Sequence, residues 1–194
     1  MNKIGEIVAS TSTEFTAECY ELHALPALGS LVKVTAPSVE IFGIVCQSGT
    51  AGIEPGRHPV ARGKDETSEE AVYQSSPQLM KLLRSEFQVL VVGHRIDGKI
   101  YQYLPSKPAH IHAFVQVCSP DEIKQFSQSF DFLSIMLNNR LQIPTEELVA
   151  ASLREMSKAQ TDPYAFLIAA GKSLTVIFSG EYQRLKTILA RLKQ

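Results

Sequence analysis

The sequence of 194 residues has no tryptophan and no apolar run long enough to cross a membrane as a helix. A spanning helix takes about 20 consecutive apolar residues, so we expect a protein without a membrane span. The N-terminus also lacks the charged segment and the long apolar segment of a secretory signal. We therefore predict a cytoplasmic protein.

Cysteine is scarce, and its three copies, Cys19, Cys46 and Cys118, are far apart with no C-x-x-C pair among them. A disulfide framework would require an even number, and a zinc site would require paired spacing. Each cysteine stands in an apolar or alternating stretch of sequence. We predict reduced thiols that act as small core residues.

An excess of charge of either sign is absent too, because 19 Lys and Arg residues balance 20 Asp and Glu residues. This balance excludes a protein that coats nucleic acid through its overall charge, although it leaves room for a local basic face. Apolar residues make up 44% of the chain and charged residues 20%, which is usual for a globular protein. A chain of this size can fold without a metal or a disulfide.

Motifs of nucleotide hydrolysis and of nucleophilic catalysis are missing. The nearest match to a G-x-x-x-x-G-K-[ST] phosphate loop is Gly171-Lys172-Ser173, where Phe166 stands in place of the first glycine. The preceding residues are helix-like, so we expect Gly171 to end or interrupt a helix. No G-x-S-x-G sequence positions a serine nucleophile, and the acidic pairs of residues 65–70 lie in a polar loop. We expect no catalytic residue and no cofactor.

Two histidines, His110 and His112, are spaced so that an extended segment would place both imidazoles on one side. His58 and His94 could join them around a metal ion, but no companion cysteine or carboxylate motif completes such a site. We therefore favour surface or lining histidines and predict no metal. A metal-binding or small-ligand barrel centred on His110 and His112 is the third alternative for the function.

The sequence pattern changes near residue 119. Before this point, short β-rich runs are separated by Gly, Pro and Ser clusters, which is typical of a barrel or sandwich. The Asp97-Gly98 step favours a tight hairpin turn. We predict strands at 3–9, 14–22, 31–35, 40–47, 87–92, 99–104 and 112–117.

Residues 48–86 interrupt this series of strands as a loop and helix insertion. Their first half is rich in glycine and charge. In the second half, Ser76 and Pro77 predict the start of a helix with an apolar face of Leu79, Leu82, Leu83 and Phe87. A long segment without strands in a compact domain is typical of functional or mobile regions.

After residue 119 the apolar residues recur with a helical period. Ser119-Pro120, Thr145 and Asp162-Pro163 predict helix starts, and residues 181–194 form a last amphipathic segment. The predicted fold class is α+β. An N-terminal barrel of six or seven strands (residues 1–118) precedes a C-terminal bundle of three or four helices (residues 119–194).

The strand segments Ile4-Gly5-Glu6-Ile7-Val8, Leu28–Val34 and Ile41–Val45, with Phe15 between them, resemble the HerA–ATP synthase (HAS) barrel. That barrel precedes the motor domain in HerA-type DNA translocases and in the large subunits of rotary ATP synthases. The later stretch from Tyr103 to Ile123 resembles its closing region, so the resemblance covers roughly residues 3–126. In this family the barrels pack side by side as a ring. The resemblance therefore implies an assembly element, although this chain lacks the motor domain.

We accordingly predict a non-enzymatic assembly or adaptor protein that self-associates through its barrel or docks on a hexameric ATPase. The alternative is a nucleic-acid-associated accessory factor of a HerA-like translocation or repair complex, which the charge balance does not favour. The loop of residues 49–63 could bind an anion through backbone N–H groups and guanidinium groups, and we favour a mobile surface loop over that site. The basic stripe of the last helix is a solvated face in its simplest interpretation. The candidate interaction residues are Arg57, His58, Arg62, Lys64, Arg184, Lys186, Arg191 and Lys193.

Overall fold

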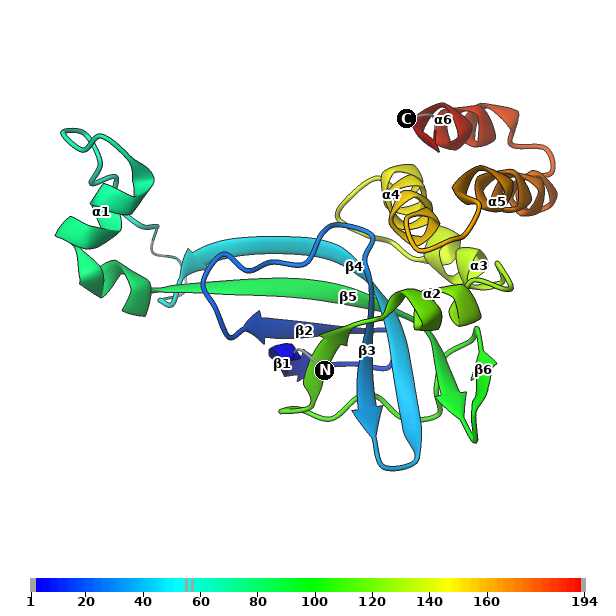
Figure 1. Cartoon of the computed structure of the whole chain (residues 1–194), viewed down its shortest axis with the longest axis horizontal. Coiled ribbons are helices and arrows are strands. Elements are labelled where there is room, and N and C mark those ends of the chain that lie inside the picture. Colours follow the sequence, from blue (N-terminus) through cyan, green and yellow to red (C-terminus); the bar gives the residue numbers. More distant parts are fainter. Residues whose placement is uncertain (1–2, 55, 57, 193–194) are drawn as a thin grey trace.

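The structure is a computed structural model that describes residues 3–54, 56 and 58–192. A β-barrel lies at the centre, a two-stranded arm projects from one side of it, and helices cover the other side (Figure 1). Within the described residues, no helix is long and apolar enough to span a membrane. The α+β class predicted from the sequence is confirmed.

Six strands close into an antiparallel barrel. They follow the order β2-β1-β7-β3-β4-β5, and pairing of β2 with β5 completes the ring, while β6 pairs with β5 outside it. The Asp97-Gly98 turn between β5 and β6 has positive φ at both residues, as predicted for a tight hairpin. The strands are β1 (Lys3–Ser10), β2 (Glu14–Cys19), β3 (Leu31–Ala36), β4 (Val39–Gly52), β5 (Leu83–Ile96), β6 (Lys99–Tyr101) and β7 (Phe114–Val117).

Apolar side chains from every strand of the ring fill the barrel interior, among them Ile7, Phe15, Val34, Val89 and Val115. The strands coil tightly, and the backbones of β1 and β2 come close together at Gly5. A Cβ at Gly5 would lie only 2.3 Å from the carbonyl oxygen of Glu18. Only glycine fits such an approach.

The helices that follow β7 pack on the outside of the barrel. Leu31, Phe42 and Leu90 point outward from β3, β4 and β5 into a second core that also contains Phe126 and Leu148 of the helices. Strands β4 and β5 are therefore buried on both faces, which explains their continuous apolar runs. The helices are α2 (Pro120–Phe126), α3 (Phe132–Asn138), α4 (Thr145–Ser157), α5 (Pro163–Ile177) and α6 (Tyr182–Leu192).

Helix starts agree with the predicted signals. Ser119 and Glu122 form a reciprocal capping box at α2, and the Asp162 side chain accepts a hydrogen bond from the Ala165 N–H at α5. Helix α3 was not predicted, and the residue before it, Asp131, makes no side-chain capping hydrogen bond. The amide of Gln102, from the segment after β6, instead accepts from the Phe132 N–H at 3.0 Å.

A half-buried ion-pair network ties α2 to the barrel. Lys33 of β3 has only 4% of its side chain exposed and donates to Glu122 of α2 and, at 3.3 Å, to Glu40 of β4. Arg95 of β5 contacts the same Glu40 at 2.6 Å and donates to Gln125 of α2 at 3.1 Å. Burial acts to raise the pKa of Glu122, but hydrogen bonds from Lys33 and from the Ser119 N–H hold that pKa below its usual value of 4.5.

Replacing Lys33 by Met should lower the free energy of unfolding by about 3 kcal/mol, because Glu122 and Glu40 would keep their burial and lose their shared cation. Urea denaturation measures this change. The matched control is Lys124→Met, whose exposed pair with Asp121 spans 3.9 Å and should contribute less than about 1 kcal/mol. Equal effects of the two substitutions would contradict a stabilising role for the network.

The lowered pKa of Glu122 also predicts the sign of a pH effect. The unfolded state binds the proton more readily than the folded state, so the stabilisation is complete above the unfolded pKa and is lost as pH falls through the folded one. The difference in unfolding free energy between wild type and Glu122→Gln should therefore shrink from about pH 6 to about pH 3. A difference that stays constant over this range in urea titrations would contradict this assignment.

Candidate interaction surfaces

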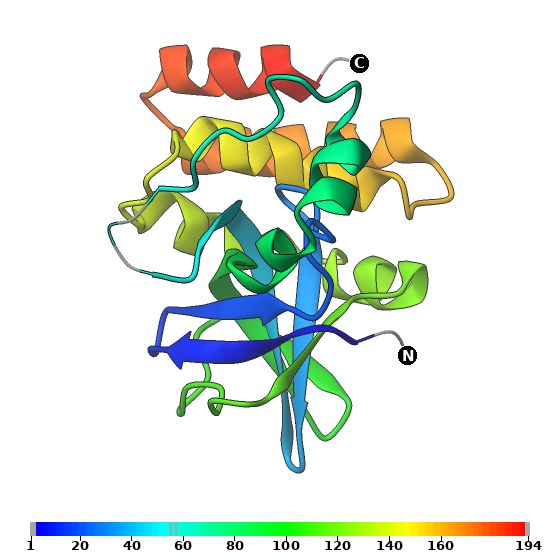
Figure 2. The same ribbon diagram turned by 90° about the vertical axis from the view of Figure 1, so that its left-hand side faces the viewer.

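The β4–β5 hairpin continues beyond the barrel as an arm. Pairing of β2 with β5 ends at Glu18 and Glu86, whereas β4 and β5 stay paired as far as Gly52 and Leu83. We call residues 53–82, which these two strands carry, the arm tip. Figure 2 looks along the arm from this tip, with the barrel behind it.

The arm corrects the prediction of a loop and helix insertion at residues 48–86. Gly49–Gly52 belong to β4, and Leu83 and Phe87 lie in β5, so the predicted helix from Ser76 is reduced to a single 3₁₀ turn, η1 (Pro77–Lys81). This segment forms a strand and not a helix because its buried side chains recur with a period of two. One face of the strand carries Ser85, Phe87, Val89 and Val91.

A short helix that the sequence analysis did not predict, α1 (Glu69–Ser75), begins within the arm tip. Its N-cap Ser68 accepts a hydrogen bond from the Ala71 N–H at 3.2 Å, and Glu69 and Glu70 occupy its first turn. Both features favour a helix start. A serine followed by two glutamates was therefore the local signal available in the sequence.

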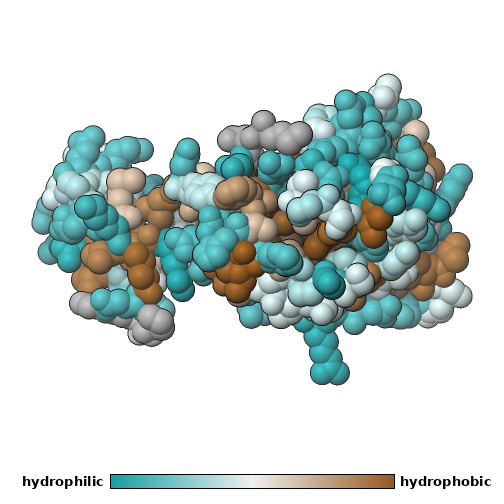
Figure 3. Space-filling view, turned by 90° about the horizontal axis from the view of Figure 1, so that it is seen from below, coloured by the Kyte–Doolittle hydropathy of each residue, from teal (hydrophilic) through white to brown (hydrophobic). Residues whose placement is uncertain are grey.

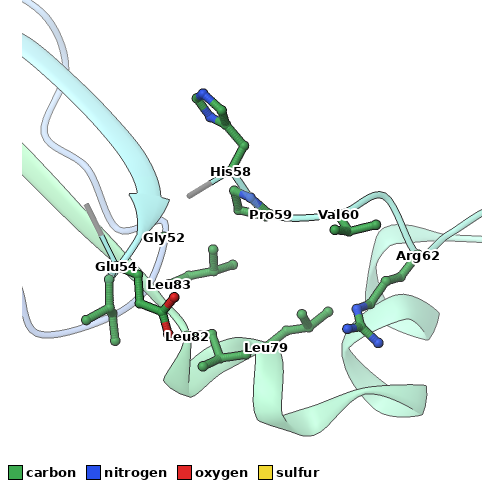
Figure 4. A pocket seen from close by; sticks show the side chains of 10 residues that line it. Gly52, Glu54, His58, Pro59, Val60, Arg62, Leu79, Leu82 and Leu83 are labelled. Carbon is green, nitrogen blue, oxygen red and sulfur yellow. The ribbon is translucent and has the colours of Figure 1, made fainter. Parts of the chain in front are cut away.

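An apolar slot of about 140 Å³ opens in the arm tip between the loop of residues 58–62 and the segment from Leu79 to Leu83. Figure 4 shows Val60 and Pro59 on one side of the slot and the leucines on the other. Val60 is 74% exposed and Leu82 is 50% exposed. Figure 3 shows apolar side chains on the arm surface, apart from those of the main body.

The arm tip gathers part of the predicted basic cluster. His58 and Arg62 line the slot and Lys64 is exposed, whereas Arg57 lies outside the described residues. In Figure 4 the His58 side chain points away from the slot, and Arg62 reaches from the loop toward the helical side. The slot itself is lined mainly by apolar side chains. The positions of the basic residues in the sequence did not predict this apolar lining.

A hydrogen-bonded cluster holds the arm tip in place. His23, in the loop after β2, contacts the Tyr73 hydroxyl of α1 through Nε2 at 2.8 Å and the Thr50 hydroxyl through Nδ1 at 3.3 Å. Ser85 completes the cluster, because its buried Oγ accepts from the His23 N–H at 2.8 Å and lies 2.6 Å from Thr50 Oγ1. Two strands, one loop and one helix thus meet at His23, through its imidazole and its backbone N–H, and sequence spacing could not reveal this contact.

Two basic side chains of helix α6 form ion pairs with helix α4. Arg184 contacts Glu146 of α4 at 2.6 Å, and Arg191 contacts Glu147 at 2.7 Å. These pairs join α6 to the first turn of α4. Of the other predicted residues, Lys186 is exposed, and Lys193 lies outside the described residues.

The histidines do not converge. His112 adopts a turn with φ of 67° and contacts Glu6 at 2.6 Å, so the predicted extended segment begins only at Phe114. His94 is buried, and its Nδ1 lies 3.1 Å from the Tyr103 carbonyl oxygen, to which it donates. Among the residues that the structure describes, no three His, Cys, Asp or Glu side chains are placed to hold a metal ion.

Gly171 lies within α5 and neither ends nor interrupts it, contrary to the prediction. A Cβ at this position would lie 3.4 Å from the Leu189 side chain of α6, which is an ordinary van der Waals distance, so the packing does not require glycine here. The N–H groups of Gly171-Lys172-Ser173 are part of a continuous helix and do not form a phosphate-binding loop.

All three cysteines are free and buried. Burial raises the pKa of Cys19 and of Cys46 to about 11 and raises that of Cys118 as well. Protonated, buried thiols are poor nucleophiles. The predicted role of the cysteines as core residues is consistent with these positions.

Comparison with known proteins finds no matching family model and no matching curated protein. The resemblance to the HAS barrel therefore depends on the strand segments quoted above and stays a prediction.

Replacing His23 by Ala should loosen the arm tip without unfolding the barrel, because the imidazole bridges α1 to Thr50. Amide hydrogen exchange of residues 69–76 should accelerate about tenfold, which corresponds to the loss of one hydrogen bond of about 1.4 kcal/mol. His110→Ala, at an exposed position, is the control. Unchanged exchange in α1 would show that the cluster does not hold the tip.

Proposed function

We propose that this chain is a non-enzymatic assembly or adaptor protein that binds another protein through its arm tip. The observation that carries the proposal is the exposed apolar slot at the end of a projecting hairpin. Single exposed apolar side chains are ordinary, whereas a contiguous group of them marks a binding surface. The barrel and its helices serve as the rigid base from which the arm projects.

The position of the apolar residues supports this proposal. Ile53, Val60, Met80 and Leu82 are all more than 40% exposed, although the main body has two well-filled cores. Enclosing one such side chain fully gains about 1.5–3 kcal/mol. A partner that covers the slot would provide this gain, and the His23 cluster would limit the entropy lost on binding by fixing the tip beforehand.

The placement of the possible reactive groups supports the non-enzymatic part of the proposal. The thiols are buried with raised pKa values, and Gly171-Lys172-Ser173 is helical. The resemblance to the HAS barrel points in the same direction, toward self-association or docking on a hexameric ATPase. Nucleic-acid binding is less favoured, because Arg184 and Arg191 are already paired with glutamates of α4.

Placing a photo-crosslinking amino acid at Val60 should yield a discrete protein adduct after irradiation of cells that contain the full chain. Val60 is 74% exposed, so the substitution should not disturb the fold. Gel electrophoresis and mass spectrometry of the adduct measure the outcome and identify the protein attached.

The same amino acid at Lys107, which is exposed in the loop before β7, is the matched control. A protein adduct at Val60 that is missing at Lys107 supports a binding surface at the tip. Equal adducts at both positions, adducts to nucleic acid only, or no adduct at Val60 would overturn the proposal.

A further inference from the structure

We propose that the arm binds an extended segment of a different protein, which pairs with the open edge of β4 and inserts one apolar side chain into the slot. This inference rests on the proposed function and names the kind of partner. Its support comes from the hydrogen-bonding groups of the β4 edge, from the sequence of that edge and from the position of the slot.

The outer edge of β4 is open along the arm. Strand β3 and the residues before it cover this edge only as far as Val45, which forms backbone hydrogen bonds with Gly29 and Ser30. Beyond Val45, none of the described residues forms a backbone hydrogen bond with the outer side of residues 47–52. In Figure 1 this edge is the upper border of the arm. Its main-chain groups are therefore accessible to a further strand.

The register of the hairpin determines which main-chain groups point outward. The Ile53 N–H donates to the Leu82 carbonyl oxygen at 3.0 Å, so these residues form a hydrogen-bonded pair. Such pairs alternate with non-hydrogen-bonded pairs along an antiparallel ladder, and the register is continuous over residues 47–52. The residues whose N–H and C=O groups point away from β5 are therefore Ser48, Thr50 and Gly52.

An extended main chain is the ligand that fits these groups. The outward groups occur on alternate residues, so they recur about every 7 Å, which is also the repeat of a second strand. Three such residues offer about six main-chain hydrogen bonds to an added strand. A helix uses its main-chain groups within its own ladder and has none to offer. Addition of a strand to an exposed sheet edge is a known mode of peptide recognition.

The β4 edge lacks the features that normally prevent such pairing. Edge strands are usually short, charged, interrupted by proline or covered. Residues 47–52, Gln-Ser-Gly-Thr-Ala-Gly, contain neither a charge nor a proline. By contrast, β6 has only three residues and begins at Lys99. The β5 edge of the arm meets the loop after β2, where the His23 N–H donates to Ser85 Oγ.

The open edge ends at the apolar slot. Gly52 and Ile53 both line the slot, with Leu79 and Leu82 opposite the loop of residues 58–62 (Figure 4). Its volume of about 140 Å³ is close to that of an apolar cavity of about 150 Å³ that binds one benzene molecule, so one apolar side chain fits. In strand addition the main chain provides affinity and side-chain pockets provide specificity. The slot should therefore select a segment with an apolar residue just beyond Gly52.

A second copy of this chain does not supply such a segment from its own open edge. If two β4 edges paired antiparallel around Thr50, Ser48 of one copy would lie opposite Gly52 of the other. The residue of that copy nearest the slot would then be Gln47, which is polar. The observations therefore favour a segment of a different protein.

The spacing of crosslinks tests whether the bound segment is extended. A short diazirine amino acid replaces either Gln47 or Ala51, which are exposed and lie on the same face of β4. After irradiation of cells that contain the full chain, mass spectrometry locates the attachment in the partner. The two attachment sites should lie about four residues apart in an extended partner. In a helix that covers the same length they would lie about nine residues apart.

A synthetic peptide with the sequence of the attached segment provides the second arm of the experiment. Fluorescence anisotropy measures its Kd for the purified full chain. Ser48→Pro removes an outward N–H and places a ring in the path of the added strand, so the Kd should rise about tenfold or more. Ser48→Ala keeps the N–H and should change the Kd less than about twofold.

A charge in the slot tests the other half of the site. Leu82→Asp, at a position that is 50% exposed, should also raise the Kd of the peptide about tenfold or more, because its apolar side chain would then meet a carboxylate. Since β5 does not use the Ser48 N–H, the Ser48 variants should keep the hairpin. Circular dichroism checks that each variant is folded.

Three results would overturn the inference: attachment sites about nine residues apart, attachment to a second copy of this chain, or a folded Ser48→Pro variant that binds the peptide as Ser48→Ala does. The proposed function fails separately. If Val60 gives a protein adduct while Gln47 and Ala51 give none, the arm tip remains a binding surface and only strand addition is wrong. If no position gives an adduct, both proposals fail.

Discussion

Pairing between β4 and β5 is the interaction on which the rest of the structure depends. One hairpin, with paired residues from Glu40 and Arg95 to Gly52 and Leu83, contributes to the barrel interior, supports the helices on its outer face and continues outward as the arm. Because side chains alternate along β5, Phe87, Val89 and Val91 belong to the first core while Leu90 and Val92 belong to the second. A shift of one residue in this register would exchange the two sets and disturb both cores together.

The local patterns of the sequence were sufficient to predict most of the main body. Short alternating runs predicted the seven strands, and Ser119-Pro120 and Asp162-Pro163 predicted helix starts, since capping depends on residues within one turn. Helix α3 was missed because its first N–H bonds to Gln102, about 30 residues earlier in the chain. The helix expected from Ser76 was wrong for a related reason, because pairing with β4 takes Leu83 into a strand.

The candidate site was less accessible to sequence analysis. The basic residues of the 49–63 loop were noticed, and His58 and Arg62 do lie together at the arm tip. The apolar slot was not predicted, because it forms only when the loop of residues 58–62 lies opposite Leu79 and Leu82. The His23 cluster joins residues 62 positions apart. On α6, the sequence displayed the basic stripe but not the glutamates of α4 that pair with Arg184 and Arg191.

The continuity of the arm with the barrel has a mechanical consequence. A force that pulls the tip away along the hairpin acts parallel to β4 and β5, so it loads the β2–β5 and β3–β4 ladders in shear. In that geometry many hydrogen bonds must stretch together before any breaks, whereas a sideways force would peel them apart one at a time. The arm would therefore resist tension along its length far better than bending.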